Sequence, residues 1–154
     1  MRALAASAAI RNLELQDLQG VTDEGMRRLQ AGATGTGLVS LNLCLCRKVT
    51  DQGIAAVAKM AALESLDLEC CAEVTSAALL ALAHSTSLKL LNLGVGTPPT
   101  CAITLDGIAA ANLPDRIKVH DWGDPMDSEV LREKIREQEG EAERFWASLR
   151  AGAR

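Results

Sequence analysis

The sequence is nearly devoid of aromatic residues, with no tyrosine, one phenylalanine and two tryptophans among 154 residues. Its core volume must therefore come from Leu, Ile, Val and Ala, which suits small units filled by aliphatic layers. It also lacks any apolar run near the roughly 18 residues that a membrane-spanning helix needs. We therefore expect no membrane insertion.

Clusters of basic residues are also missing. The 16 Lys and Arg residues are interspersed with 20 Asp and Glu residues, and the formal net charge is −4. A nucleic-acid-binding face would instead show Lys and Arg gathered without compensating acids. We therefore expect no nucleic-acid partner.

Residues arranged for catalysis are scarce as well. The two histidines, His84 and His120, stand in no recognisable Ser-His-Asp or Cys-His spacing. No glycine-rich loop leads into a helix with a lysine, as a phosphate-binding loop does. Asp67 and Glu69 share one strand face, but nothing in the sequence desolvates them for acid–base work. The sequence predicts a protein that is not an enzyme and has no cofactor.

What the sequence does contain is a repeated unit, seen most clearly in residues 63–82, LESLDLECCAEVTSAALLAL. Leu66 and Leu68 alternate with Asp67, which is the pattern of a short strand with one buried face. Thr75 is suited to cap the start of a helix, and leucines follow at the i, i+3 spacing of one helix face. About 25 residues thus hold a strand, a turn and a helix, too few to close a core alone.

The pattern recurs along the chain. The central strand residues are Glu14, Asn42, Asp67 and Asn92, at intervals of 28, 25 and 25, with a weaker fifth strand centred on Lys118. Helix starts are predicted in residues 21–25, 49–53, 74–76 and 103–107. A fixed period in the twenties indicates a solenoid, in which each unit buries its apolar face against its neighbours.

Residues 38–53 and 63–76 resemble the leucine-rich repeat family, in its cysteine-containing, F-box-associated subtype. Units of that subtype read L-x-x-L-x-L-x-x-C-x-x-(I/V)-T-D-x-G, with Cys46 and Cys71 here at the cysteine position. Ser76 and Ala78 replace the Asp and Gly in the third unit. The resemblance covers roughly residues 4–122 and implies an α/β solenoid of short parallel strands with helices on the convex side. In this family the fold does not determine the function.

These patterns divide the chain into a solenoid over residues 1–122 and a C-terminal capping helix and tail over residues 123–154. The solenoid has four to five units, of which the first and last are degenerate. We expect a turn at 123–126 and then a helix from about Glu129 that covers the open end of the array. Near the C-terminus, Phe145 and Trp146 either fold back as part of this cap or form a hook that docks into a partner's groove.

Three further segments are irregular. Residues 4–15 match the apolar positions of 82–93, so we expect the chain to begin inside a repeat helix, with a mildly basic targeting presequence as the alternative. Residues 31–37 are Gly/Thr-rich, and we interpret them as a surface insertion. Residues 94–102 contain Pro98-Pro99 and predict a stiff protruding loop, which is either a simple insertion or a recognition element.

Five cysteines are present, and their spacing follows the repeat. An odd number spaced in this way argues against a secreted disulfide framework and favours an intracellular compartment, the cytoplasm in the first place and the mitochondrion as the alternative. Cys46 and Cys71 share one register and predict a ladder of small core side chains. With Cys44 and Cys70 nearby, a zinc site and a redox role are the other hypotheses, but no histidine follows at the spacing of a zinc finger. We expect the ladder and no metal.

Outward strand residues should line the concave surface of such a solenoid, and we predict that a partner protein binds there. The predicted rows are Asn12, Ser40, Ser65, Leu90 and Arg116; Glu14, Asn42, Asp67, Asn92 and Lys118; and Gln16, Cys44, Glu69, Gly94 and His120. Acids lie on the early strands and bases on the last. This polarity would orient a partner of the opposite charge order.

Three functional hypotheses follow. The first is a non-catalytic protein-interaction scaffold, monomeric by itself, acting as a small subunit of a larger assembly. The second, implied by the resemblance, is the substrate-recognition module of a ubiquitin-ligase adaptor, although no segment here resembles an F-box. The third, also from the resemblance, is a mitochondrial assembly or coupling factor, which only the N-terminal segment supports.

Overall fold

The computed structural model describes residues 10–94, 102–121 and 124–126. Five short strands form a parallel sheet in chain order, and a sixth pairs antiparallel with the fifth. The strands are β1 (Asn12–Glu14), β2 (Ser40–Asn42), β3 (Ser65–Asp67), β4 (Leu90–Asn92), β5 (Lys118–Asp121) and β6 (Asp124–Met126). The helices are α2 (Asp23–Ala31), α3 (Ala33–Gly37), α4 (Asp51–Val57), α5 (Ser76–Ala83) and α6 (Leu105–Ala111).

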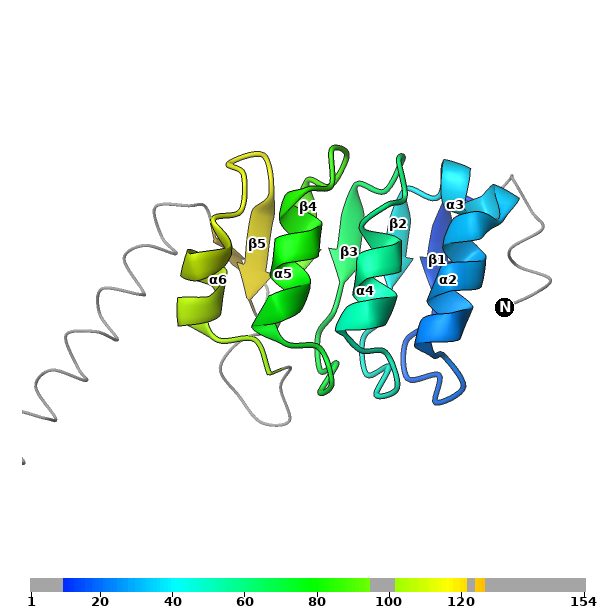
Figure 1. Cartoon of the computed structure of the whole chain (residues 1–154), viewed down its shortest axis with the longest axis horizontal. Coiled ribbons are helices and arrows are strands. Elements are labelled where there is room, and N and C mark those ends of the chain that lie inside the picture. Colours follow the sequence, from blue (N-terminus) through cyan, green and yellow to red (C-terminus); the bar gives the residue numbers. More distant parts are fainter. Residues whose placement is uncertain (1–9, 95–101, 122–123, 127–154) are drawn as a thin grey trace, which may run out of the picture.

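Consecutive strand–helix pairs lie side by side (Figure 1), with α2, α4, α5 and α6 all on one face of the sheet. The first four strands are each followed by one of these helices before the chain returns to the next strand. The predicted α/β class with short parallel strands is confirmed.

The core lies between the sheet and these helices. The central residues of the strands, Leu13, Leu41, Leu66, Leu91 and Val119, pair in register, and all five are buried. Leucines two positions further along the first four strands form a second buried row. The helices contribute Met26, Leu29, Ile54, Val57, Leu79, Leu82 and Ile108 to the same cluster. Aliphatic layers thus fill the interior, as the near absence of aromatic residues predicted.

A threonine begins each of the four principal helices, as predicted. The hydroxyl oxygens of Thr22, Thr50, Thr75 and Thr104 each accept a hydrogen bond from a backbone N–H of the first helical turn. All four have an extended backbone, which is the usual conformation of an N-cap residue.

Aspartates in the first helical turn join neighbouring strand–helix pairs. The Asp23 carboxylate accepts hydrogen bonds from the backbone N–H and the hydroxyl of Thr50, both at 2.8 Å. The Asp51 carboxylate accepts the same two bonds from Thr75, both at 2.7 Å. At the next junction Ser76 stands in place of an aspartate, and its hydroxyl accepts one bond of 3.3 Å from the N–H of Thr104.

The predicted cysteine ladder is confirmed for Cys46 and Cys71. Both side chains are fully buried. The Cys46 thiol donates to the Leu15 carbonyl and the Cys71 thiol to the Leu43 carbonyl, each at 3.1 Å. Each thiol therefore reaches the backbone of the preceding strand–helix pair, and these two cysteines act as small core residues that donate a weak hydrogen bond.

Two local predictions were wrong. The segment 31–37, interpreted as a surface insertion, instead extends α2 and forms α3, in which Thr34 and Gly35 are buried. A Cβ at Gly35 would lie 2.5 Å from the carbonyl oxygens of Leu29 and Gln30, so the small residues are needed for close packing against α2. The turn predicted over 123–126 was wrong in its bounds: the chain does reverse direction here, since Asp121 pairs antiparallel with Asp124, but 124–126 form β6, a proline-containing strand at the edge of the sheet.

Several predictions fall on residues outside the described part of the chain. They are the repeat helix or presequence before Ile10, the stiff loop within 95–101, the capping helix from about Glu129, and the hook or cap at Phe145 and Trp146.

Candidate functional site

The face of the sheet opposite the helices carries two rows of outward side chains in register. We call it the open strand face, because among the described residues no helix lies over it (Figure 1). One row is Asn12, Ser40, Ser65, Leu90 and Lys118, and the other is Glu14, Asn42, Asp67, Asn92 and His120. Gln16, Cys44, Glu69 and Gly94 continue the face two residues beyond the second row.

The structure corrects the predicted register of the last strand by two residues. Lys118 pairs with Leu90 and His120 with Asn92, whereas we predicted that Lys118 would pair with Asn92. Arg116, predicted to lie beside Leu90, precedes β5, and its guanidinium donates a hydrogen bond to the Ser85 carbonyl. The basic groups of the open strand face are therefore Lys118 and His120 alone among the described residues.

The error has a simple cause. Side chains alternate between the two faces of a strand with a period of two, so a shift of two residues leaves inside and outside unchanged. We assigned Ile117 and Val119 to the two buried leucine positions of the other strands. In the structure Val119 pairs with Leu91, and Ile117 is buried just before the strand.

Charge on the open strand face is separated along the order of the strands, with acids on β1 and β3 and a lysine on β5. Glu14 is exposed on β1, Asp67 and Glu69 are partly exposed at the end of β3, and Lys118 is exposed on β5. Within the described part of the chain, neither Asp67 nor Glu69 forms an ion pair, whereas the nearby Glu64 pairs with Lys89 at 2.8 Å. The acidic residues at the end of the central strand β3 therefore carry charge that no ion pair compensates within the described residues.

Polar side chains fix the strand ends that form this surface. The Asn42 side-chain oxygen accepts a bond of 2.8 Å from the N–H of Cys44. One strand further on, Asp67 Oδ1 accepts a bond of 2.9 Å from the N–H of Glu69. Asn92 Nδ2 donates to Asp67 Oδ2 at 3.0 Å. These bonds hold the outward residues of three adjacent strands in fixed positions.

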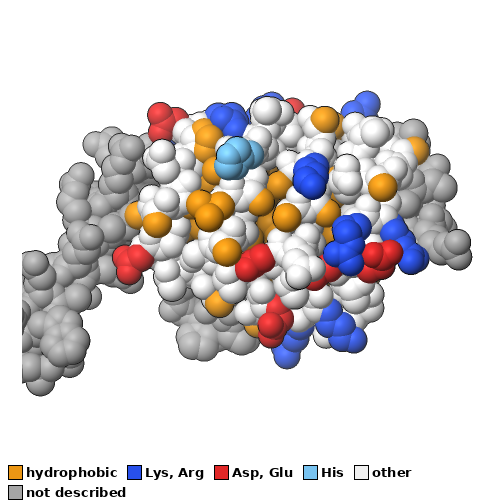
Figure 2. Space-filling model, viewed as in Figure 1, with side chains coloured by type: hydrophobic (Ala, Val, Ile, Leu, Met, Phe, Trp, Pro, Cys, Tyr) orange, Lys and Arg blue, Asp and Glu red, His pale blue; other side chains and the backbone are white. Residues whose placement is uncertain are grey.

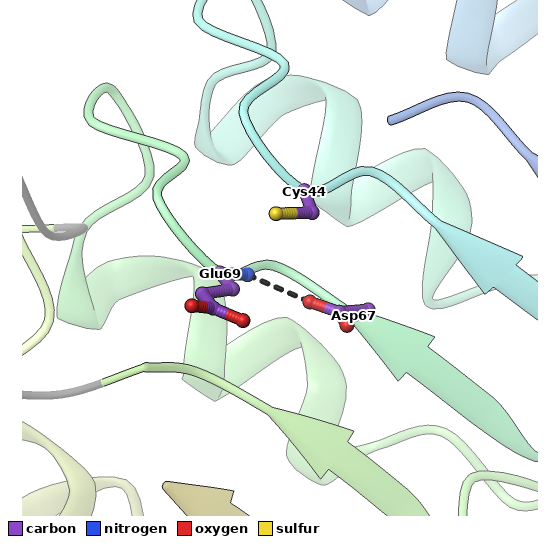
Figure 3. Close-up of side chains that lie close together, drawn as sticks. All are labelled: Cys44, Asp67 and Glu69. Atoms are coloured by element: carbon purple, nitrogen blue, oxygen red, sulfur yellow. Dashed lines mark hydrogen bonds between the residues drawn. The ribbon is translucent and has the colours of Figure 1, made fainter. Parts of the chain in front are cut away.

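Three ligand-type side chains converge at the end of β3. The Cys44 sulfur and one carboxylate oxygen each of Asp67 and Glu69 all lie within 4.8 Å of one another (Figure 3). Cys44 lies on this face as predicted, but its side chain is buried, with 9% exposed. Burial, together with the nearby Asp67 and Glu69 carboxylates, raises the pKa of the Cys44 thiol to about 11.

The sequence placed Cys44 beside Glu69 in one predicted row and Asp67 with Glu69 on one strand face, but we did not combine the three residues into a metal site. We compared cysteines only with other cysteines and with histidines. A signal was available, because Cys44 and Glu69 are 25 residues apart and so occupy equivalent positions on neighbouring strands.

The absence of a side chain at Gly94 leaves space for the Glu69 side chain. The Gly94 backbone is left-handed, with φ of 55°, and a Cβ there would lie 2.6 Å from Glu69 Cγ. We expect Gly94→Ala to lower the free energy of unfolding by about 1–2 kcal/mol, because alanine is strained at this φ. The measurement is urea unfolding followed by circular dichroism.

Gly20→Ala is the matched control, since nothing lies within 4 Å of a Cβ at that position. It should leave stability unchanged or raise it slightly. Adding Glu69→Ala to Gly94→Ala should recover the part of the lost stability that comes from the contact between the new Cβ and the Glu69 side chain. Equal stability of the two single glycine variants would contradict this account of Gly94.

The helical face offers a weaker site. Acidic and basic side chains are intermixed on it, among scattered apolar ones (Figure 2). An open cavity of about 410 Å³ lies between the C-terminal parts of α4 and α5, lined mainly by alanines with Lys59, Met60 and His84. A His84 ring nitrogen lies 2.7 Å from the Leu80 carbonyl oxygen. The lining thus has few polar groups to orient a ligand.

No protein-family model and no curated protein matches the chain. None of the helices in the described residues has both the length and the apolar composition to cross a membrane. The absence of enzymatic activity stays a prediction from the sequence. Function is therefore inferred from the geometry of the open strand face.

Proposed function

We propose that this chain is a leucine-rich repeat solenoid of the cysteine-containing subtype and serves as a non-catalytic scaffold that binds another protein. Three features support the assignment to this fold: strands paired in chain order, an inward leucine row, and cysteine thiols bonded to the preceding strand–helix pair. The concave surface of such a solenoid corresponds to the open strand face.

The observation that carries the proposal is the ordered and charged open strand face. Five parallel strands about 4.8 Å apart span roughly 19 Å, the scale of a helix or an extended segment of a partner protein. The backbone is rigidly paired beneath the outward side chains, so little conformational entropy is lost there when a partner binds. The carboxylates on β1 and β3 favour basic groups on the part of the partner that faces them. Lys118 on β5 favours acidic groups on the part that faces it.

The test is affinity capture from cell lysate with the double variant Asp67→Lys/Glu69→Lys, compared with wild type. We expect at least a tenfold loss of the captured partner, because reversing the charge of both acidic residues introduces repulsion. Glu73→Lys/Asp115→Lys is the matched control, since it makes the same charge change at two exposed positions outside the open strand face. Circular dichroism must show that both variants are folded.

A third bait, Phe145→Ala/Trp146→Ala, distinguishes binding through the open strand face from binding through the predicted C-terminal hook. A partner lost only with the Asp67/Glu69 variant supports binding through the open strand face. A partner lost only with the Phe145/Trp146 variant would refute the proposal and make the hook the contact. The identity of the partner then distinguishes a scaffold from a ubiquitin-ligase adaptor or a mitochondrial assembly factor.

A further inference from the structure

We propose that Cys44, Asp67 and Glu69 bind a divalent metal ion of the Zn²⁺ class at the end of β3. The site uses three side chains of the open strand face (Figure 3) but does not depend on the proposed protein partner. It also differs from the zinc hypothesis raised by the sequence, which combined four cysteines.

The spacing of the three donor atoms suits a metal after a small movement. They lie within 4.8 Å of one another. Around a tetrahedral Zn²⁺, with Zn–S near 2.3 Å and Zn–O near 2.1 Å, donor atoms lie roughly 3.4–3.6 Å apart. Hydrogen bonds hold the Asp67 carboxylate in place, but Glu69 is only partly buried and its carboxylate makes no hydrogen bond among the described residues. Rotation of the Glu69 side chain can therefore close the difference of about 1 Å.

The Cys44 thiol is the independent observation that points to a ligand. Cys44 as a residue is only 9% exposed, and within the described residues its thiol makes no hydrogen bond. Cys46 and Cys71 are buried too, but each donates to a backbone carbonyl and thereby serves the core. Cys44 is instead directed toward two carboxylates that have no cationic partner among the described residues.

The negative charge of Asp67 is not required by the fold. Asn42 makes the equivalent bond to the N–H two residues ahead on the preceding strand, so an amide is sufficient for that turn. The carboxylate adds a second acceptor, which Asn92 Nδ2 uses, and a negative charge beside a second carboxylate and a thiol. A cation would relieve the repulsion between these groups, and a mixed sulfur and oxygen donor set favours Zn²⁺ over Mg²⁺ or Ca²⁺.

Metal binding at this site must release one proton. A cysteine thiol is protonated at neutral pH, and binding forms the Zn–S bond as the S–H bond breaks and the proton passes to solvent. Affinity should therefore rise about tenfold per pH unit across neutral pH. Metal binding to the carboxylates alone would release almost no proton.

The experiment is titration of the full chain with Co²⁺ and with Zn²⁺. A Co²⁺–thiolate charge-transfer band reports the sulfur ligand, and calorimetry in two buffers of different ionisation enthalpy counts the protons released. Wild type should show the band and about one proton per ion. Cys44→Ser should lose both, with affinity reduced ~100-fold or more, beyond the effect of removing a supporting residue.

Cys70→Ser is the matched control, because Cys70 is the neighbouring thiol outside the three-residue cluster and should not be needed. Glu69→Gln, whose side chain makes no hydrogen bond among the described residues, should weaken Zn²⁺ binding while leaving the fold intact. No thiolate band in wild type, or a band unchanged in both Cys44→Ser and Glu69→Gln, would overturn the proposal. Capture of a protein partner is not part of this test, so either proposal can fail without the other.

Discussion

Replacing Leu66 with alanine should lower the free energy of unfolding by about 2–5 kcal/mol. Leu66 is 1% exposed in the central strand β3, between Leu41 and Leu91 in the buried row. Truncation leaves a cavity that neighbours held on both sides by paired backbone cannot fill. Urea unfolding, monitored by circular dichroism, gives the value directly.

Leu90 provides the control for this prediction. It lies on the next strand but points to the opposite face of the sheet, and it is 36% exposed. Leu90→Ala should change stability by less than about 1 kcal/mol. A loss below about 0.5 kcal/mol for Leu66→Ala would mean that the assignment of inward and outward strand residues is wrong.

Replacing Asp51 with alanine should lower the free energy of unfolding by about 2–3 kcal/mol. The variant removes two charge-assisted hydrogen bonds to Thr75, one of them from a partly buried backbone N–H that would be left without a partner. It also removes a favourable acid from the first turn of α4. Thermal or urea unfolding measures the sum of these effects.

Asp106→Ala is the control for this prediction. The difference between the two variants gives the share of the stability loss that is due to the bonds between strand–helix pairs. Asp106 occupies the first turn of α6, as Asp51 does in α4, but it is exposed and forms no hydrogen bond within the described residues. Its loss should lower stability by about 0.5 kcal/mol, through the helix dipole alone. Equal losses for the two variants would show that the Thr75 bonds contribute nothing.

Much of the fold was predictable because one sequence pattern recurs several times along the chain. Alternation around Asp67 is weak in a single strand, but its recurrence at Asn42 and Asn92 specifies both the strands and their parallel pairing. The helix starts were predictable for the same reason, since a threonine recurs at each. The fifth strand has only Ile117 and Val119 to mark it, and a period of two does not distinguish registers two residues apart.

Other features depend on contacts that composition does not encode. The Gly/Thr-rich segment 31–37 has the composition of a loop, yet close packing against α2 makes it helical. Pro125 and Gly123 indicated a turn, yet pairing with β5 makes an edge strand of residues 124–126. In both places tertiary contacts outweigh local preference.

The candidate site was predictable in its outline. Strand alternation assigned Glu14, Asp67 and Glu69 to one surface, and the structure agrees. The approach of Cys44 to the two carboxylates was not predicted, because it depends on side-chain direction across neighbouring strands. The bonds from Asp23 and Asp51 to the next threonine were also missed, although the Thr-Asp pair was visible in the sequence.

Ser76 stands at the start of α5 where the two earlier helices have an aspartate. We call the resulting junction between α5 and α6 the seam. Two carboxylate bonds join the first pair to the second and the second to the third. Among the described residues, the side-chain link from α5 to the start of α6 is one neutral bond, beside a backbone bond from the Ala102 N–H to the Val74 carbonyl. Local opening should therefore begin at this junction, so that amide protons of α6 and β5 exchange with solvent while the earlier strands stay protected. Because Lys118 and His120 lie beyond the seam, any ligand that engages them closes the opening and slows that exchange by mass action.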